Sequence, residues 1–138
     1  MYDKERIVVI IEEIESYFEE LKSMDIKKLQ DMDTIKFRAV SMDIFSIINK
    51  TIDLADEVSR AKNLGFPSEY KEIFTGLRMA KVIDEIMESK LKDLIILRNK
   101  ISHRYSILKK EDIFKALKEV EIVKEFIEAV KRVMKEKR

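Results

Sequence analysis

The side chains best suited to chemistry lie in one short segment, from Arg98 to Tyr105. It contains His103, the only histidine of the chain, five residues after Arg98 and two before Tyr105. An imidazole titrates near neutral pH, so it can act as a general base or a general acid. A guanidinium keeps its charge and matches phosphate oxygens bidentately. RNA cleavage without a metal ion needs such a set, because attack by the 2′-hydroxyl requires a base, an acid and positive charge at the phosphorus.

Basic residues are concentrated around this histidine. Residues 90–110 contain seven basic side chains against one acidic side chain, whereas residues 1–33 contain ten acidic and five basic ones. The net charge of the whole chain is only +1, so it is the local excess that indicates a phosphate-rich ligand such as RNA. The alternative is a solvated basic face that is balanced across the fold by an acidic N-terminal helix.

The composition is typical of a folded cytoplasmic domain. The chain has 138 residues, of which 46% are hydrophobic and 40% charged, so we expect one domain over residues 1–138. The apolar run 7–11 is too short for a signal peptide or a membrane span, which predicts a soluble cytoplasmic protein without a membrane partner. The absence of cysteine excludes disulfides, and a single histidine disfavours a tight zinc or iron site. We therefore expect neither a metal nor a cofactor.

Apolar side chains recur at helical spacing throughout the chain, and no segment has the alternation of a strand. We expect helices over residues 7–21, 34–58, 68–77, 79–103 and 112–134. Asp33, Ser68 and Asp112 are the expected N-caps, and the breaker cluster 63–67 separates the second helix from the short third one. The prediction is an all-α, up-and-down bundle of four main helices plus a short helix.

On the helix 79–103, an advance of about 100° per residue places five polar side chains in one arc of about 160°. They are Arg98, Asn99, Ser102, His103 and, if the helix continues so far, Tyr105. One or two turns earlier, Leu91 and Ile95 point in the same directions, so this side passes from a core or an interface into a polar cleft. An arginine buried there needs a carboxylate, water or a ligand anion, because an unpaired buried charge is costly. Lys100 and Arg104 lie outside the arc, on the expected solvent face.

Each of these residues also has a plain structural explanation. His103 at a helix end favours the helix dipole, and Arg98 alone could be half of a salt bridge. Tyr105 could be an aromatic residue at the edge of the core, and Asn99 a local hydrogen-bonding residue. Their joint order and spacing, within the most basic window of the chain, favour a functional site instead.

Residues 98–105 spell R-N-x-x-x-H-x-Y, which resembles the motif of HepT-type toxins of the HEPN superfamily. These are small all-helical ribonucleases encoded beside a minimal nucleotidyltransferase antitoxin. Other parts of the chain fit the same family. They are the interruption 65–70, then Phe74 and Leu77, and the closing helix with Phe114 and Leu117. The similarity therefore covers nearly the whole chain, although Ser102 stands where family members often carry an aliphatic residue.

The resemblance implies a metal-independent endoribonuclease with a composite site formed across a homodimer. Arg98 and His103 would be catalytic and Asn99 would orient them, with Ser102 as a supporting polar residue. The residues themselves agree with a dimer, since one chain supplies one histidine and a two-fold axis would bring two copies of His103 to one cleft. A water molecule or Tyr105 could replace the second imidazole.

The resemblance also implies a regulated toxin. In HepT-type toxins the tyrosine of the H-x-Y extension, here Tyr105, is where the nucleotidyltransferase partner attaches AMP and blocks activity. Lys100 and Arg104 are the expected RNA contacts, and tRNA or mRNA is the substrate that the family suggests. Two interpretations remain open beside this one: a non-catalytic helical partner of a minimal nucleotidyltransferase, and an all-α homodimeric scaffold. The scaffold explains the bundle but not the polar arc.

Overall fold

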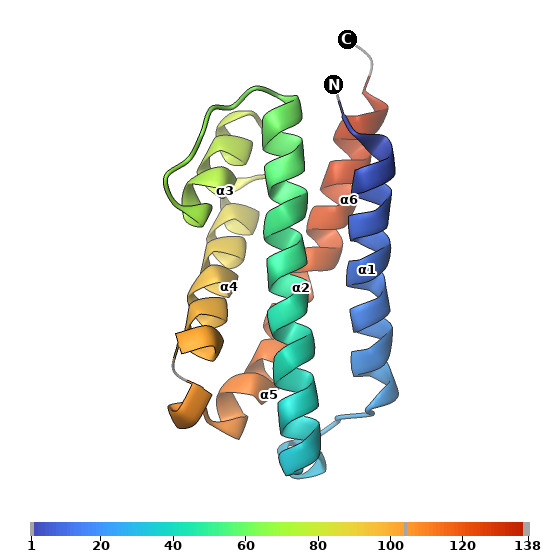
Figure 1. Ribbon diagram of the computed structural model, residues 1–138, viewed down its shortest axis with the longest axis vertical. Coiled ribbons are helices and arrows are strands. Elements are labelled where there is room, and N and C mark those ends of the chain that lie inside the picture. The colour runs from blue at the N-terminus through green and yellow to red at the C-terminus, as the bar shows by residue number, and fades with distance from the viewer. Residues whose placement is uncertain (1, 104, 137–138) are drawn as a thin grey trace.

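The computed structural model describes residues 2–103 and 105–136, which form six α-helices and two short 3-10 helices without a strand. In chain order they are α1 (Lys4–Ser23), η1 (Leu29–Asp31), α2 (Thr34–Ala61), α3 (Tyr70–Met79), α4 (Glu85–His103), η2 (Tyr105–Ile107), α5 (Lys110–Glu119) and α6 (Ile122–Lys135). In Figure 1, α2 runs through the centre with α1 on one side and α3 and α4 on the other, and α1 begins where α6 ends. The predicted all-α bundle is confirmed.

Each long helix buries one stripe of apolar side chains, as its periodicity predicts. In α1 the buried residues are Ile7, Ile10, Ile11, Ile14 and Leu21. The stripes meet in a common core, where Phe74 of α3 and Phe126 of α6 lie edge to face with ring centroids 5.9 Å apart. Within the described residues, no helix is both long and apolar enough to cross a membrane.

The three predicted N-caps have different outcomes. Asp33 caps α2 as predicted, because its carboxylate accepts the N–H of Lys36 at 2.8 Å. Ser68 does not cap α3: its N–H and hydroxyl instead donate to the carboxylate of Glu72, at 3.1 and 3.2 Å. Asp112 is not a cap either, since α5 begins two residues before it. In both places a carboxylate in the first turn of the helix accepts an N–H from a residue before the helix begins, Glu72 from Ser68 and Asp112 from Lys109.

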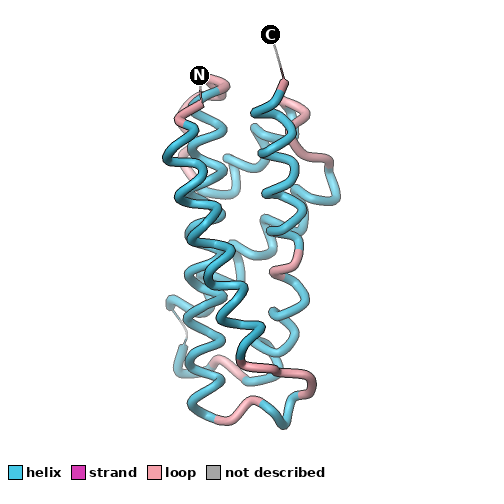
Figure 2. Tube along the Cα trace, turned by 90° about the vertical axis from the view of Figure 1, so that its right-hand side faces the viewer, coloured by secondary structure: helices cyan, strands magenta, loops and turns pink. Residues whose placement is uncertain are grey.

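Two helix boundaries also differ from the prediction. α4 begins later than expected, after a turn in which Lys81 has a positive φ of 63°. The predicted last helix is two helices, α5 and α6, which meet at Val120 and Glu121; Figure 2 shows this interruption as a short loop partway along the bundle. There the N–H of Glu121 donates to Lys118 and that of Val123 to Val120, at 3.2 and 3.0 Å. Hydrogen bonds between residues three positions apart tighten the backbone as in a 3-10 helix. No glycine or proline lies at this junction, so the sequence contains no sign of the break.

Candidate active site

α4 presents the predicted site because burial stops before the end of the helix on the side of Leu91 and Ile95, while Ile101 on another side stays buried. Leu91 and Ile95 are only 1% and 3% exposed, which places this side of α4 in the core. Further along, Arg98 is half-buried, and Ser102 and His103 are exposed. One side of the helix therefore passes from the core to exposed polar residues, and the polar cleft expected there remains a prediction.

Arg98 is held by side chains from three helices. Its Nε donates to Oδ1 of Asn49 in α2 at 2.8 Å, and its Nη1 donates to Oδ1 of the adjacent Asn99 at 2.9 Å. The guanidinium carbon lies 5.4 Å from the ring centroid of Tyr70 in α3 and 5.8 Å from that of Phe45 in α2. Both distances are within the range of a cation–π interaction. The guanidinium is thus fixed where α2, α3 and α4 meet.

All four of these partners are uncharged. Among the described residues, no carboxylate lies within salt-bridge distance of Arg98. Amide oxygens and aromatic faces attract a guanidinium without cancelling its charge. The plain explanation of Arg98 as half of a salt bridge is therefore wrong for this part of the molecule, and its positive charge is available to an anion.

His103 is the last residue of α4, and its side chain is exposed. It lies five positions after Arg98, which corresponds to about 140° around the axis and about 7.5 Å along it. The fold therefore brings Asn99 into contact with Arg98 but points His103 in another direction. Arg104 lies outside the described residues. Tyr105 opens η2, and its side chain lies outside the described part as well.

Lys100 has a partner on the other side of α4. Its Nζ lies 3.3 Å from Oδ2 of Asp112 in α5, and the same carboxylate oxygen accepts the N–H of Lys109 at 3.3 Å. Burial opposes ionisation of Asp112, but these hydrogen bonds and charges outweigh it and hold the pKa of that carboxyl below its ordinary value. Lys100 therefore ties α4 to α5, and its contact with RNA remains a prediction.

The sequence alone did not identify three of the residues around Arg98 as site residues. Phe45 belongs to the apolar pattern of α2, and Tyr70 follows the breaker cluster before α3, so neither pattern indicates a contact with an arginine. Asn49 is one polar residue within a long amphipathic helix, and its partner is 49 residues away in the chain. No local signal in the sequence could have found this contact.

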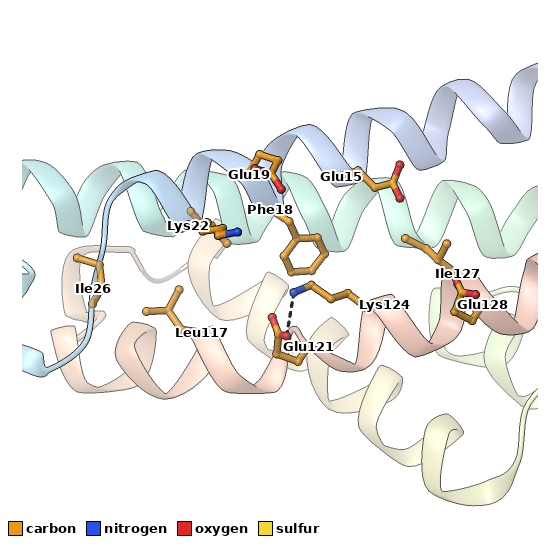
Figure 3. A pocket seen from close by; sticks show the side chains of 11 residues that line it. Glu15, Phe18, Glu19, Lys22, Ile26, Leu117, Glu121, Lys124, Ile127 and Glu128 are labelled. Atoms are coloured by element: carbon orange, nitrogen blue, oxygen red, sulfur yellow. Dashed lines mark hydrogen bonds and ion pairs between the residues drawn. The ribbon is translucent and has the colours of Figure 1, made fainter.

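A large hollow on the described surface lies elsewhere, between α1 and the junction of α5 with α6, with a volume of about 830 Å³. Figure 3 shows Lys124 reaching beneath Phe18 and bonding Glu121, with Glu15 and Glu19 above it on α1. It contains none of the predicted site residues. Four glutamates and two lysines line it, and this excess of negative charge disfavours the phosphates of RNA.

The described residues form a small all-α protein whose α4 carries both Arg98 and His103. The model of the family described as Ribonuclease HepT-like matches residues 7–133, so the chain belongs to the HepT-like ribonuclease family. A search of curated proteins finds no significant match.

Several solved structures share this fold. One is a tri-AMPylated Shewanella oneidensis HEPN toxin in complex with an MNT antitoxin, with a TM-score of 0.84, 23% identity, and coverage of 96% of this chain and 99% of that one. Another is a toxin–antitoxin crystal structure with AMP-PNP, with a TM-score of 0.83, 21% identity, and coverage of 91% and 97%. A third is the cytosolic protein YutE of Bacillus subtilis, whose function is unknown, with a TM-score of 0.80, 20% identity, and coverage of 97% and 93%.

Proposed function

We propose that this protein is a metal-independent endoribonuclease and the toxin of a toxin–antitoxin pair, acting on cytoplasmic RNA such as tRNA or mRNA. One observation carries the proposal: the half-buried guanidinium of Arg98 is held by uncharged groups only, on the helix that ends at His103. A charge fixed in this way stabilises the negative charge that develops during phosphoryl transfer. Membership of a ribonuclease family supports the same reaction.

In this proposal His103 removes the proton from the 2′-hydroxyl of the RNA, and the oxygen attacks the adjacent phosphorus. The bond from phosphorus to the 5′-oxygen breaks, and a general acid donates the proton that makes this oxygen a hydroxyl. The products are a 2′,3′-cyclic phosphate and a 5′-hydroxyl end. Arg98 neutralises the phosphorane between the two steps, and Asn99 and Ser102 add polar contacts beside it.

The general acid is best supplied by His103 of another copy of this chain. Arg98 and His103 of one chain project about 140° apart around α4, and a two-fold arrangement would place the arginine of one chain near the histidine of the other. An exposed apolar residue supports such a contact: Ile96, which is 53% exposed, lies on the same side of α4 as Asn99 and His103. Met42, which is 54% exposed, lies seven residues before Asn49 on the neighbouring face of α2.

A minimal nucleotidyltransferase is the proposed antitoxin. The AMPylated toxin and its MNT antitoxin among the solved structures support this partner, and the AMP-PNP complex supports a nucleotide-dependent step. In that step the hydroxyl oxygen of Tyr105 would attack the α-phosphorus of ATP, forming a phosphotyrosyl ester and releasing pyrophosphate. An added phosphate close to Arg98 would compete with the phosphate of RNA for the same charge. Lys100 and Arg104 are the proposed contacts to the RNA backbone.

The test is incubation of purified protein with total cellular RNA in EDTA, read on a denaturing gel. Wild type should produce discrete fragments, whereas Arg98→Ala and His103→Ala should produce none while remaining folded and dimeric. Arg132→Ala, an exposed arginine on α6, is the matched control and should cleave like wild type. If unmodified dimeric wild type left the RNA intact, the non-catalytic partner of a nucleotidyltransferase would become the better assignment.

A further inference from the structure

The side chains that hold Arg98 come from helices outside the motif. We infer that Asn49 and Tyr70 are positioning residues: they fix the guanidinium of Arg98 and leave its charge uncompensated for a phosphate. This inference rests on the proposed function, because it explains how the arginine of that site is made ready for substrate. It concerns α2 and α3, which the R-N-x-x-x-H-x-Y segment does not include.

The hydrogen bonds leave part of the guanidinium free. Arginine has five N–H donors in a fixed plane. One of them, on Nε, is bound by Asn49, and one on Nη1 is bound by Asn99. The remaining three are on the two terminal nitrogens, Nη1 and Nη2, and can donate to phosphate oxygens. Asn49 therefore occupies Nε and leaves these donors of the terminal nitrogens to a ligand.

The aromatic contact adds a second restraint. Tyr70 is the first residue of α3, and its ring centroid lies 5.4 Å from the guanidinium carbon. Its side chain is 50% exposed, so the ring stands at the surface beside the place where a ligand would approach. The attraction depends on the ring face and not on the hydroxyl. Phenylalanine should therefore replace Tyr70 without loss, whereas an aliphatic side chain should not.

The side chain of Asn49 is an amide and carries no charge. Aspartate has nearly the same shape and would accept the same hydrogen bond from Nε, but it would add a negative charge beside the guanidinium. The resulting ion pair would keep Arg98 in place and cancel the charge that a phosphate needs. Asn49→Asp therefore separates the two possible roles of this position. A purely structural role tolerates the substitution, whereas a role in presenting charge does not.

The first measurement is the Nε–H signal of Arg98 in NMR spectra of ¹⁵N-labelled protein, assigned by its loss in Arg98→Lys. In wild type this signal should exchange slowly with water and shift when inorganic phosphate is added. Asn49→Ala should make the exchange fast, and Asn49→Asp should keep it slow but remove the response to phosphate. A wild-type signal that exchanges fast, or a phosphate response retained in Asn49→Asp, would overturn the inference whether or not the protein cleaves RNA.

The second measurement is cleavage of an RNA oligonucleotide. Asn49→Asp should lower kcat by about tenfold or more with a smaller change in KM, because the lost charge acts mainly in the transition state. Asn63→Asp makes the same chemical change just after the end of α2 and should behave like wild type. Tyr70→Leu should lower kcat, and Tyr70→Phe should restore it.

The two proposals fail in different ways. Absence of cleavage by wild type would remove the proposed function, while the NMR experiment would still decide whether Asn49 and Tyr70 hold Arg98. Cleavage by wild type and by Asn49→Asp at the same rate would leave the proposed function intact and show that Asn49 has no part in presenting the charge.

Discussion

At the scale of single residues, Arg98 and Lys100 show how the fold distinguishes two nearby cations. They lie about 200° apart around α4, so they meet different neighbours. Arg98 meets amides and aromatic rings, none of which carries a charge. Lys100 meets the carboxylate of Asp112 at 3.3 Å. The charge of Arg98 is left for a substrate, whereas that of Lys100 is partly compensated within the protein.

This difference predicts different kinetic effects. Arg98→Ala should lower kcat for RNA cleavage by about a hundredfold or more, because a preorganised charge acts on the transition state. Lys100→Ala should leave kcat unchanged, raise KM a few-fold and reduce the salt dependence of binding, as the loss of one phosphate contact does. Its free energy of unfolding should fall by less than about 1 kcal/mol, because the ion pair with Asp112 is largely solvated. Steady-state cleavage and urea unfolding measure both, and an equal loss of kcat in the two variants would contradict the assignment.

At the scale of elements, the antiparallel seam between α1 and α2 carries charged side chains at intervals of seven residues. The ion pairs along it are Arg6 with Glu57 and Glu13 with Lys50. One interval further, Asp43 meets Glu20, a second carboxyl group, and one oxygen of Asp43 is buried without a hydrogen-bond partner. Burial, and next the charge and hydrogen bonding of Glu20, raise the pKa of Asp43 from 3.8 to about 7. This end of the seam is therefore more stable when the pair holds a proton.

The raised pKa predicts how stability depends on pH. Between pH values of about 4 and about 7, the folded protein keeps a proton on Asp43 that the unfolded chain has released. The contribution of this group is therefore fully present below pH 4 and is lost as the pH rises through 7. An amide at this position resembles the protonated acid, so Asp43→Asn should be more stable than wild type at pH 8 and similar to it at pH 4. Urea midpoints at both values measure this, and a constant difference would show that Asp43 is not protonated in the folded state.

At the scale of the whole molecule, the core joins the site to the far side of the bundle. Phe74 lies on α3, one turn after Tyr70, and packs edge to face against Phe126 of α6. The two phenylalanines are 1% and 0% exposed. The position of α3, and with it the ring that contacts Arg98, therefore depends on packing against a helix that has no residue in the site.

The burial of each phenylalanine predicts how much its loss lowers the free energy of unfolding. Phe126→Ala should lower the free energy of unfolding by about 3–5 kcal/mol, because it removes a buried ring and leaves a cavity. Phe66 is 98% exposed, so Phe66→Ala should change that free energy by no more than about 0.5 kcal/mol. Urea unfolding of the two variants provides the comparison, and similar losses would mean that the described core is not the one that stabilises the protein.

The proposed dimer predicts a second contrast between two exposed residues. Ile96→Glu places a charge on the face of α4 that carries Asn99 and His103, so it should give a monomer and abolish cleavage together. Ile86 is 68% exposed and lies on another side of α4, so Ile86→Glu should remain dimeric and active. Light scattering after size-exclusion chromatography, with the RNA assay, measures both properties. An active monomer of Ile96→Glu would exclude a site shared between two chains.

Helix formation was largely predictable from this sequence, because it depends on residues three and four positions apart. The stripes of α1 and α2, the cap at Asp33 and the polar arc at the end of α4 all follow from such local spacing. The errors at Ser68, Asp112 and the α5–α6 junction arose where a neighbouring carboxylate or a tight turn replaced the usual signal.

The pairing of helices was decided only by the tertiary structure. The sequence by itself determined the helical class, and the pattern at residues 98–105 placed arginine and histidine on one helix. Packing of distant segments determined that Arg98 binds Asn49 and Tyr70, that Lys100 pairs with Asp112, and that Asp43 meets another acid. The physical reason is that such contacts depend on how each helix turns and slides against its neighbours, which the spacing within one helix does not encode.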